Sequence, residues 1–396
     1  MHANLTIFLS LLFLQVTTST LLESPSKMTT PLARLNSSLK LNIPVFLLLV
    51  VFVSDAQPQN LVKKHHKVSA VLVFGDSTSD PGNNNYILTP FKGNFPPYGR
   101  DFADQKPTGR FSNGLLTSDF IARHVGVKDN VPAYLDPSLT IHDFMTGVSF
   151  ASAGSGYDPL TPTISNVIPL PRQLEYFKEY KVKLVAAIGK KKTKEIINNA
   201  LYLVSAGTND FVVNYFTLPI RRHEYSLPSY MNFVMKTQLD FLQALWGEGA
   251  RKIGVAGLPP MGCLPIVITL FSKNAIHDRG CIDFFSSVAR TYNSMLQTQL
   301  NLMHFNHAHE GARIAYFDIY SPLLDGIVGH KYGFKEVRLG CCGTGLLETT
   351  FLCNPSSKTC SDASKYAFWD SIHPTQEMYK ICSKALQPTI DHMIRD

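Results

Sequence analysis

The fold follows from Val71-Leu72-Val73-Phe74-Gly75-Asp76-Ser77-Thr78-Ser79-Asp80, an apolar run that stops at a glycine and continues into polar residues. A short run rich in β-branched and aromatic residues is typical of a strand buried on both faces. The polar residues after Gly75 are of the types that cap helices. A serine at the carboxyl end of a parallel strand lies where open α/β sheets hold their ligands. Taken alone, Ser77 is more readily a capping residue than a nucleophile, so the rest of the chain has to decide.

Further apolar runs alternate with amphipathic segments along the chain. The apolar runs cover residues 147–151, 200–205, 251–256 and 312–317, and helical periodicity covers residues 118–124, 171–199, 228–247 and 284–303. Strands and helices that alternate on this scale predict a parallel sheet with helices on both faces, which is an α/β fold. The chain has 396 residues, 45% hydrophobic and 17% charged, as is typical of a globular protein with a sizeable core.

The positive charge of the chain is modest. The formal net charge is +7, and the three lysines at residues 190–192 are typical of a solvated face. No nucleic-acid-binding motif accompanies them, so we do not expect nucleic acid as a partner.

The N-terminal region contains two apolar runs, at residues 5–16 and 43–53, and Ser54-Asp55-Ala56 follows the second. Basic residues before a short apolar run and small residues after it are typical of a secretory signal peptide. Neither run reaches the roughly 18–20 residues that span a bilayer, so no stable membrane span is expected. We predict an N-terminal extension and signal region at residues 1–56 and a single domain at residues 57–396.

Cysteine usage agrees with secretion. The seven cysteines lie at positions 263, 281, 341, 342, 353, 360 and 382. An oxidising compartment favours disulfides, and we expect three bridges among six cysteines, with Cys382 left as a buried thiol and the pairing open. The spacing matches no zinc site, so no metal is expected. Met28 is an alternative start of the chain, and the glycosylation sequons at Asn4 and Asn36 precede the predicted cleavage point.

A second group of polar residues, Asp370-Ser371-Ile372-His373, can activate a serine. A serine hydroxyl becomes a nucleophile when a base takes its proton, and histidine is the usual base near neutral pH. Asp370 can orient the imidazole of His373 through its other nitrogen. An oxyanion needs hydrogen-bond donors, and the candidates are the amide of Asn209, a glycine N–H within residues 154–156 and the N–H of Ser77.

The chain resembles the plant-type GDSL esterases/lipases of the SGNH hydrolase superfamily. The blocks that carry the resemblance are Phe74-Gly75-Asp76-Ser77, Asp80-Pro81-Gly82-Asn83-Asn84-Asn85, Ser149-Phe150-Ala151-Ser152-Ala153-Gly154-Ser155-Gly156, Gly207-Thr208-Asn209-Asp210, Pro259-Pro260-Met261-Gly262-Cys263-Leu264-Pro265, Cys341-Cys342-Gly343-Thr344-Gly345 and Phe368-Trp369-Asp370-Ser371-Ile372-His373-Pro374-Thr375. They cover essentially the whole chain after the signal region. The resemblance implies a three-layer flavodoxin-like fold with a central parallel sheet and helices on both faces. Thr78 stands where the family name has leucine, and no catalytic position departs from the family pattern.

The resemblance also assigns roles to the site residues. It implies Ser77 as nucleophile, His373 as base and Asp370 as the residue that orients the base. The oxyanion hole is predicted at Ser77, Gly156 and Asn209, with Gly154 as the alternative to Gly156.

These observations predict a secreted, extracellular serine hydrolase of the apoplast or cell wall that cleaves carboxylic esters through an acyl-enzyme. We expect a small-molecule or lipid ester as substrate, no cofactor, and a monomer. The alternatives are an acyltransferase that uses the same acyl-enzyme and a non-catalytic binding or defence-associated protein on the same scaffold. Residues 80–114, which are dense in Asn, Gly and Pro, are either a binding loop or a structural loop. We expect this segment and the loop after Asn209 to shape the acyl site.

Overall fold

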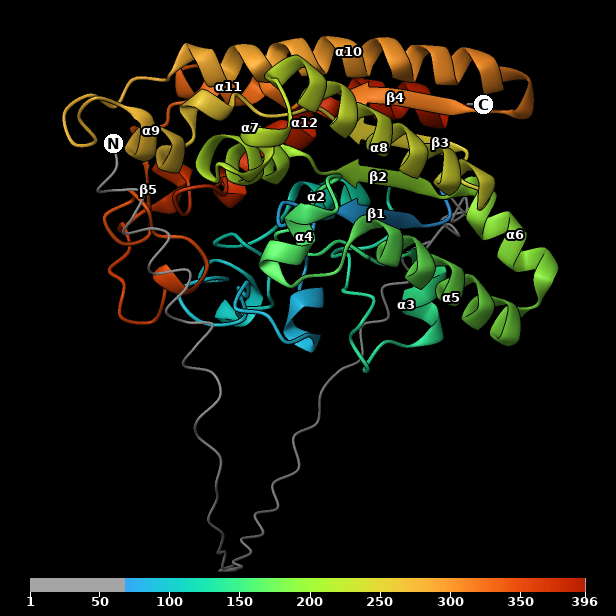
Figure 1. The fold of residues 1–396 in the computed structure, drawn as a ribbon. Coiled ribbons are helices and arrows are strands. Elements are labelled where there is room, and N and C mark those ends of the chain that lie inside the picture. Colours follow the sequence, from blue (N-terminus) through green and yellow to red (C-terminus); the bar gives the residue numbers. More distant parts are fainter. Residues whose placement is uncertain (1–67, 396) are drawn as a thin grey trace, which may run out of the picture. The chain divides into compact units, whose positions relative to one another are not determined.

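Four parallel strands form the centre of the fold (Figure 1). The computed structural model describes residues 68–395. In spatial order the strands are β1 (Val71–Gly75), β2 (Leu201–Ser205), β3 (Lys252–Ala256) and β4 (Arg313–Phe317), and all neighbours are parallel. Each strand falls within a predicted apolar run, so the predicted α/β fold class with a parallel sheet is confirmed.

The apolar run at residues 147–151 lies against the free edge of β1 without forming a regular strand. Val73 donates its N–H to the Val148 carbonyl at 3.1 Å, and Phe150 donates to the Val73 carbonyl at 2.7 Å. Val73 and Ser149 form only an isolated parallel bridge, so the prediction of a strand here is wrong. With this segment included, the order is the 2-1-3-4-5 of flavodoxin-like sheets, which bind ligands where the order reverses, here between β1 and β2.

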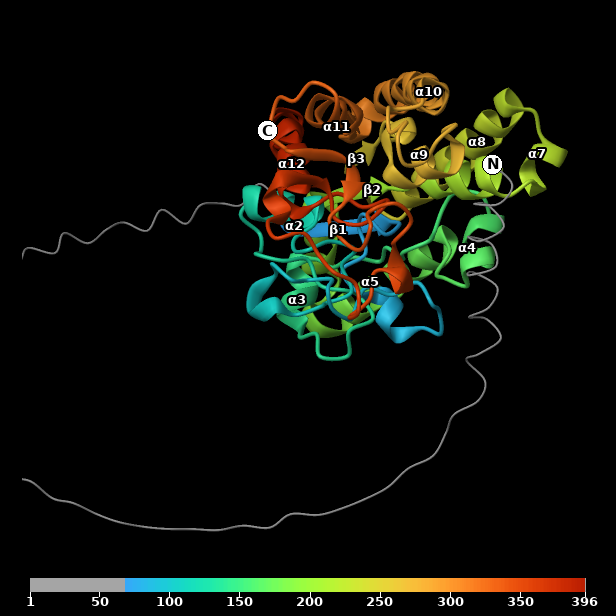
Figure 2. The same cartoon turned by 90° about the vertical axis from the view of Figure 1, so that its left-hand side faces the viewer.

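Helices cover both faces of the sheet. Figure 2 shows helices α2 (Thr117–His124), α11 (Tyr320–Ile327) and α12 (Gln376–Ile394) on one side of the strands, and α5 (Leu170–Ile188), α8 (Leu227–Gly247) and α10 (Asp283–His307) on the other. Contacts of α12 with α2, α11 and β4 hold the first layer, and contacts of α8 with α5 and α10 hold the second. The fold is therefore three-layered, as predicted.

The residues of β1 alternate between the two helical layers. Val71 and Val73 belong to an apolar cluster that includes Ile121 of α2 and Leu386 of α12. Phe74 points the other way, and its ring lies 5.8 Å from the rings of both Phe177 of α5 and Phe241 of α8. Burial on both faces explains why β1 is a continuous apolar run.

Shorter elements connect these layers. They are helices α3 (Ile141–Thr146), α4 (Leu160–Ser165), α6 (Lys190–Asn199), α7 (Ile220–Glu224) and α9 (Pro265–Phe271), the π-helix Asp210–Thr217, the paired strands β5 (Glu336–Gly340) and β6 (Tyr366–Phe368), and 3-10 turns at Asn83–Tyr86, Ala103–Gln105, Met261–Cys263, Ala308–Glu310, Thr350–Leu352 and Ala363–Lys365. The helix predicted at residues 171–199 is divided into α5 and α6, because Gly189 between them takes a φ of +81°, which favours glycine.

The number of disulfides is the one that the sequence predicts. Disulfides join Cys263 to Cys281, Cys341 to Cys360 and Cys342 to Cys353. Cys382 is the free, buried cysteine. The expectation of three bridges and one buried thiol is confirmed.

The predicted signal region, at residues 1–56, lies outside the described residues, together with both sequons and the domain boundary at residue 57. Within residues 68–395, no helix has the length and apolarity needed to span a bilayer. The described residues belong to one contact unit.

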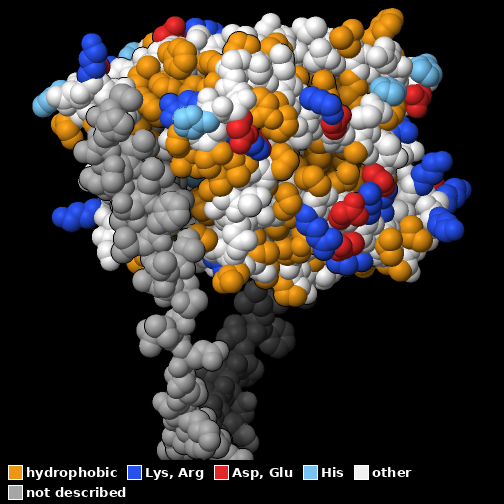
Figure 3. All heavy atoms as spheres, viewed as in Figure 1, with side chains coloured by type: hydrophobic (Ala, Val, Ile, Leu, Met, Phe, Trp, Pro, Cys, Tyr) orange, Lys and Arg blue, Asp and Glu red, His pale blue; other side chains and the backbone are white. Residues whose placement is uncertain are grey.

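Basic side chains on the surface lie among acidic ones. On the face seen in Figure 3, some Lys and Arg side chains stand beside Asp and Glu, and others at its left and right edges stand apart from them. Among the basic residues of α5, Lys178 pairs with Glu175 at 2.9 Å, and Lys181 pairs with Glu248. This face carries no continuous basic surface of the kind that binds nucleic acid.

Gly75, at the end of β1, is a position where a side chain does not fit. Its φ is +137°, and an added Cβ would lie 1.8 Å from the Ser205 carbonyl oxygen. We expect Gly75→Ala to lower the free energy of unfolding by about 3 kcal/mol or more, because backbone strain and a steric clash add. Urea unfolding measures this loss.

Gly189→Ala is the matched control. Gly189 also has a positive φ of +81°, but no atom lies within 4 Å of an added Cβ. Only backbone strain of about 1–3 kcal/mol is expected there, without the added cost of a clash. Equal losses in the two variants would contradict the assignment of a clash at Gly75.

Candidate active site

The three residues predicted to form a triad lie within hydrogen-bond distance of one another. Ser77 follows the carboxyl end of β1, and His373 lies between β6 and α12. The Nε2 of His373 is 2.8 Å from the Oγ of Ser77, and its Nδ1 is 2.7 Å from the Oδ2 of Asp370. All three side chains are buried. An ionised carboxylate only accepts hydrogen bonds, so Nδ1 carries the proton and Nε2 is left as the acceptor for the serine hydroxyl.

Asp370 is held as an anion by its surroundings. Its Oδ1 accepts hydrogen bonds from the N–H groups of Ile372 at 2.8 Å and His373 at 2.7 Å. Burial favours the neutral acid, but the electrostatic attraction of the His373 ring and these hydrogen bonds together hold the pKa of Asp370 below its ordinary value. A carboxylate in this state can both orient the imidazole and stabilise its protonated form.

Tyr98 is a contact of Asp370 that sequence reasoning missed. Its hydroxyl donates to Asp370 Oδ2 at 2.7 Å and accepts from the Thr350 N–H at 2.8 Å. Thr349 also donates to Asp370 Oδ2, at 3.1 Å. Tyr98 lies in the predicted loop at residues 80–114, so that loop contributes to the site by supporting Asp370. The sequence signal was a lone tyrosine after two prolines, which indicates a turn and nothing about its partner.

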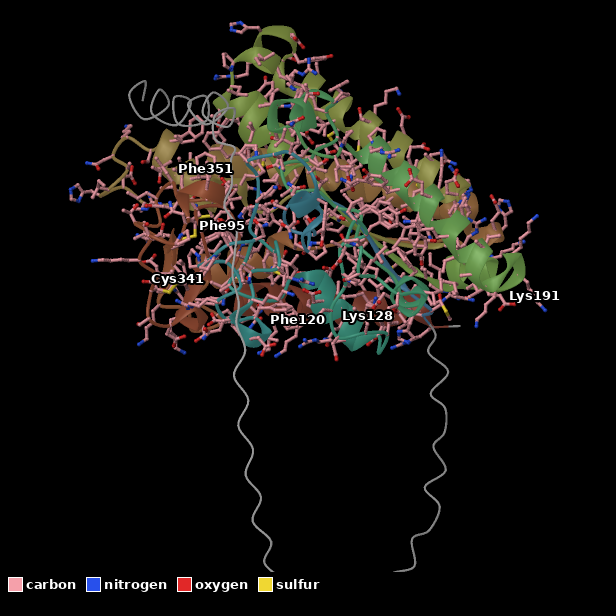
Figure 4. All side chains as sticks on the ribbon, turned by 90° about the horizontal axis from the view of Figure 1, so that it is seen from below. Phe95, Phe120, Lys128, Lys191, Cys341 and Phe351 are labelled. Atoms are coloured by element: carbon pink, nitrogen blue, oxygen red, sulfur yellow. A yellow bond between two sulfur atoms is a disulfide. The ribbon has the colours of Figure 1, made fainter. Side chains whose placement is uncertain are left out.

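An apolar cluster stabilises this side of the site. Tyr98 and Phe111 pack with the disulfide-bonded Cys341 and with Trp369, and Phe95 packs against them. Figure 4 shows Phe95 and Cys341 on the same side of the molecule. The ring of Phe111 also lies 5.0 Å from the imidazole of His373. The disulfide-bonded segment and the loop at residues 80–114 thus hold the base and its carboxylate from one side.

The predicted oxyanion donors gather near the carboxyl ends of β1 and β2. The Nδ2 of Asn209 donates to the Ser155 carbonyl at 2.9 Å, which orients the amide and leaves its second N–H free. Within residues 68–395, the N–H groups of Ser77, Gly154 and Gly156 have no hydrogen-bond acceptor. An added Cβ on Gly156 would lie 2.1 Å from a carboxylate oxygen of Asp210, so glycine is required there. The choice between Gly154 and Gly156 stays open.

Asp210 and Asp80 hold the loop that carries these two glycines. Asp210 accepts hydrogen bonds from the N–H of Tyr157 at 2.8 Å and from the hydroxyl of Thr161. Asp80 accepts from the N–H of Ala153 at 3.0 Å. Burial raises the pKa of Asp210 to about 7 and that of Asp80 to about 6. Both residues lie in sequence motifs named above. That they hold this loop could not be predicted, because the hydrogen bonds are tertiary contacts.

A cavity of about 100 Å³ opens at Ser77 and Asn209. Its walls come from the ends of β2, β3 and β4 and from α2, α11 and α12. None of residues 80–114 or 210–226 lines this cavity, so the expectation that these two loops shape the acyl site stays a prediction. Helix α11, which forms part of the cavity wall, was not predicted from the sequence.

The family model for GDSL-like lipases and acylhydrolases matches residues 71–386, from the first residue of β1 into α12. The chain belongs to the GDSL-like lipase/acylhydrolase family. The match includes every predicted site residue of this GDSL chain. The family predicted from the sequence and the reaction class, hydrolysis of carboxylic esters, are thereby confirmed.

Curated relatives of this GDSL chain come from Arabidopsis thaliana. GDSL esterase/lipase At5g45960 is 59% identical over 333 residues, which are 84% of this chain and 89% of the relative. GDSL esterase/lipase At1g06990 is 44% identical over 326 residues, or 82% and 90% of the two chains. GDSL esterase/lipase APG is 45% identical over 322 residues, or 81% and 90%. The similarity extends over nearly the whole length of these relatives.

The raised pKa of Asp210 predicts a pH dependence of stability. Because burial raises this pKa from 3.8 to about 7, the folded chain keeps a proton that the unfolded chain loses above about pH 4. The contribution of Asp210 to stability therefore falls as the pH rises from about 4 to about 7. We expect the free energy of unfolding of the wild type, relative to Asp210→Asn, to fall by about 4 kcal/mol between pH 4 and pH 8. Urea unfolding at a series of pH values measures this.

Asp240→Asn is the control for this comparison. Asp240 lies on the surface of α8, where it pairs with Lys236. Its replacement is expected to leave the pH dependence of unfolding unchanged. A difference between wild type and Asp210→Asn that stays constant from pH 4 to pH 8 would refute the prediction.

Proposed function

We propose that the chain is a secreted serine esterase that hydrolyses carboxylic esters through an acyl-enzyme on Ser77. The observation that carries the proposal is the continuous hydrogen-bonded series Ser77–His373–Asp370, with distances of 2.8 Å and 2.7 Å, at the opening of a cavity. Its position at the carboxyl end of β1, beside the reversal of strand order, is where this class of sheet binds ligands.

Acylation begins with attack of the Ser77 Oγ on the ester carbonyl carbon. His373 Nε2 takes the serine proton as the new oxygen–carbon bond forms, and Asp370 stabilises the resulting imidazolium. His373 then gives the same proton to the leaving alcohol as the ester carbon–oxygen bond breaks. This order leaves the acyl group on Ser77 and the imidazole neutral again.

The oxyanion of the tetrahedral intermediate needs donors fixed in advance. The Ser77 N–H, the free N–H of the Asn209 amide and the N–H of Gly156 or Gly154 supply them in this proposal. Asn209 is oriented by the Ser155 carbonyl, and the loop that carries both glycines is held by Asp80 and Asp210. Removal of one such donor typically costs about 10²–10³-fold in rate.

Deacylation repeats the chemistry with water. His373 takes a proton from a water molecule, the hydroxide oxygen attacks the acyl carbon, and Ser77 recovers its proton as the acid leaves. An acceptor alcohol in place of water would make the chain an acyltransferase. Product analysis in the presence of a competing alcohol separates the two outcomes, and free acid as the main product is the expected result.

Secretion and a monomeric state belong to the same proposal. Six of the seven cysteines are paired in the disulfides, which favours an oxidising, extracellular compartment. The predicted signal region at residues 1–56 agrees with that compartment.

The triad predicts which single substitutions stop turnover. We expect Ser77→Ala, His373→Ala and Asp370→Asn each to lower kcat for p-nitrophenyl acetate by about 10⁴-fold or more. The loss follows because the nucleophile, the base or the correct tautomer of the base is missing. Steady-state kinetics with each purified variant measure it.

Ser69→Ala is the matched control, because Ser69 lies before the opposite end of β1 and its hydroxyl donates to the Ile196 carbonyl at 2.7 Å. Its kcat is expected to equal that of the wild type. Turnover by Ser77→Ala at the wild-type rate would overturn the proposal, and no turnover by the wild type would favour a non-catalytic binding protein.

A further inference from the structure

Ser77 lies between two residues that are both bound to Ser205, the last residue of β2, the strand beside β1 (Figure 1). On one side, the N–H of Asp76 donates to the Ser205 carbonyl at 3.0 Å. On the other side, the Thr78 hydroxyl lies 3.0 Å from the Ser205 hydroxyl. The neighbouring strand therefore holds the turn that carries Ser77 both before and after that residue.

Asp76 completes this group of contacts. Its Oδ1 accepts two hydrogen bonds from Thr78, one from the N–H at 3.0 Å and one from the hydroxyl at 2.8 Å. Because the Thr78 hydroxyl has one proton and gives it to Asp76, the Ser205 hydroxyl is the donor to Thr78. Burial raises the pKa of Asp76, but Oδ1 can accept whether or not the other oxygen carries a proton. One series of hydrogen bonds thus runs from Ser205 through Thr78 to Asp76.

The same turn leaves the N–H of Ser77 free. Asp76 Oδ1 accepts the N–H of Thr78, as in an Asx turn. The N–H of Ser77, which lies between them in sequence, has no acceptor within residues 68–395. This N–H is one of the proposed oxyanion donors, and its direction depends on the backbone that the contacts with Ser205 restrain.

The side-chain part of this group of contacts depends on a threonine at position 78. Leucine, which the family name has at this position, can neither donate to Asp76 nor accept from Ser205. Thr78 is half-buried and lines the cavity beside Ser77. The Ser205 hydroxyl has no other hydrogen-bond partner among the described residues. A substitution at either residue therefore removes this contact without breaking a second one of Ser205.

We propose that Thr78 is a positioning residue of the reaction, which acts by fixing the turn around Ser77. Its hydroxyl holds the turn against the end of β2, so that the Ser77 hydroxyl meets His373 and the Ser77 N–H meets the oxyanion. A misplacement of about 1 Å in such a site can cost about 10²-fold in rate. The inference rests on the proposed function, because it needs Ser77 as the nucleophile.

Thr78→Val tests the hydroxyl with little change in side-chain volume. We expect kcat for p-nitrophenyl acetate to fall about 10–100-fold and KM to stay within about twofold of the wild type, because the misplaced groups act in the transition state. Thr78→Ser keeps the hydroxyl and is expected to retain most of the wild-type kcat. A wild-type kcat in Thr78→Val, or a loss confined to KM, would overturn the inference.

A double-mutant cycle tests whether Thr78 and Ser205 act through their mutual contact. Ser205→Ala removes the donor to Thr78 and leaves the Ser205 carbonyl in place for Asp76. We expect it to lower kcat by about three- to tenfold, as the loss of one hydrogen bond predicts. The double variant is expected to be no slower than Thr78→Val alone, because the contact is already lost there. Losses that multiply would show independent effects and would refute the link.

Thr237→Val is the matched control. Thr237 is half-buried, as Thr78 is, but it lies on α8, where its hydroxyl donates to the Phe233 carbonyl at 3.0 Å. Its kcat and KM are expected to equal those of the wild type. A fall in kcat as large as that of Thr78→Val would overturn the assignment of a positioning role. Thermal melts show whether each variant is folded, and Ser205→Ala decides if Thr78→Val is not.

The failures of the two proposals are distinguishable. If the wild type hydrolyses the acetate in a Ser77-dependent way while Thr78→Val and Ser205→Ala keep the wild-type kcat, the inference about Thr78 alone is wrong. If the wild type shows no Ser77-dependent hydrolysis, both proposals are wrong.

Discussion

Five hydrogen bonds converge on the buried carboxylate of Asp370, and the geometry of the site depends on them. Two come from the backbone of its own turn, one from the His373 imidazole, and two from the hydroxyls of Tyr98 and Thr349. A buried anion is stable only when its lone pairs are satisfied in this way. Because the carboxylate is fixed, the imidazole has one tautomer and one orientation, and Nε2 meets the Ser77 hydroxyl.

The opposite half of the site is also held by buried carboxyl groups, although burial raises their pKa values. Asp80 and Asp210 are buried carboxylates that accept backbone N–H groups from either side of Gly154 and Gly156. By accepting these N–H groups, the two side chains hold the glycine-containing loop. Both halves meet where the strand order reverses between β1 and β2. The parallel sheet therefore sets the position of the site, and the buried carboxyl groups fix the orientation of its residues.

Much of this arrangement could be predicted from the sequence. Short apolar runs that alternate with amphipathic segments indicate the four strands. The chemistry of serine, histidine and aspartate indicates Ser77, His373 and Asp370 as the candidate triad. The contact of Tyr98 with Asp370 could not be predicted, because it joins residues that are 272 positions apart through an irregular loop. The cavity wall on α11 and α12 was missed for a similar reason: periodicity shows that a helix has an apolar face, and it does not show which part of that face leaves space.

Covalent labelling tests the central claim, the activation of Ser77 by His373, most directly. The protein is treated with an alkyl fluorophosphonate, which reacts with activated serines, and the modified peptide is located by mass spectrometry. The account predicts one adduct, on Ser77, and its loss in His373→Ala. An adduct on another serine, or labelling of Ser77 at the same rate in His373→Ala, would contradict it.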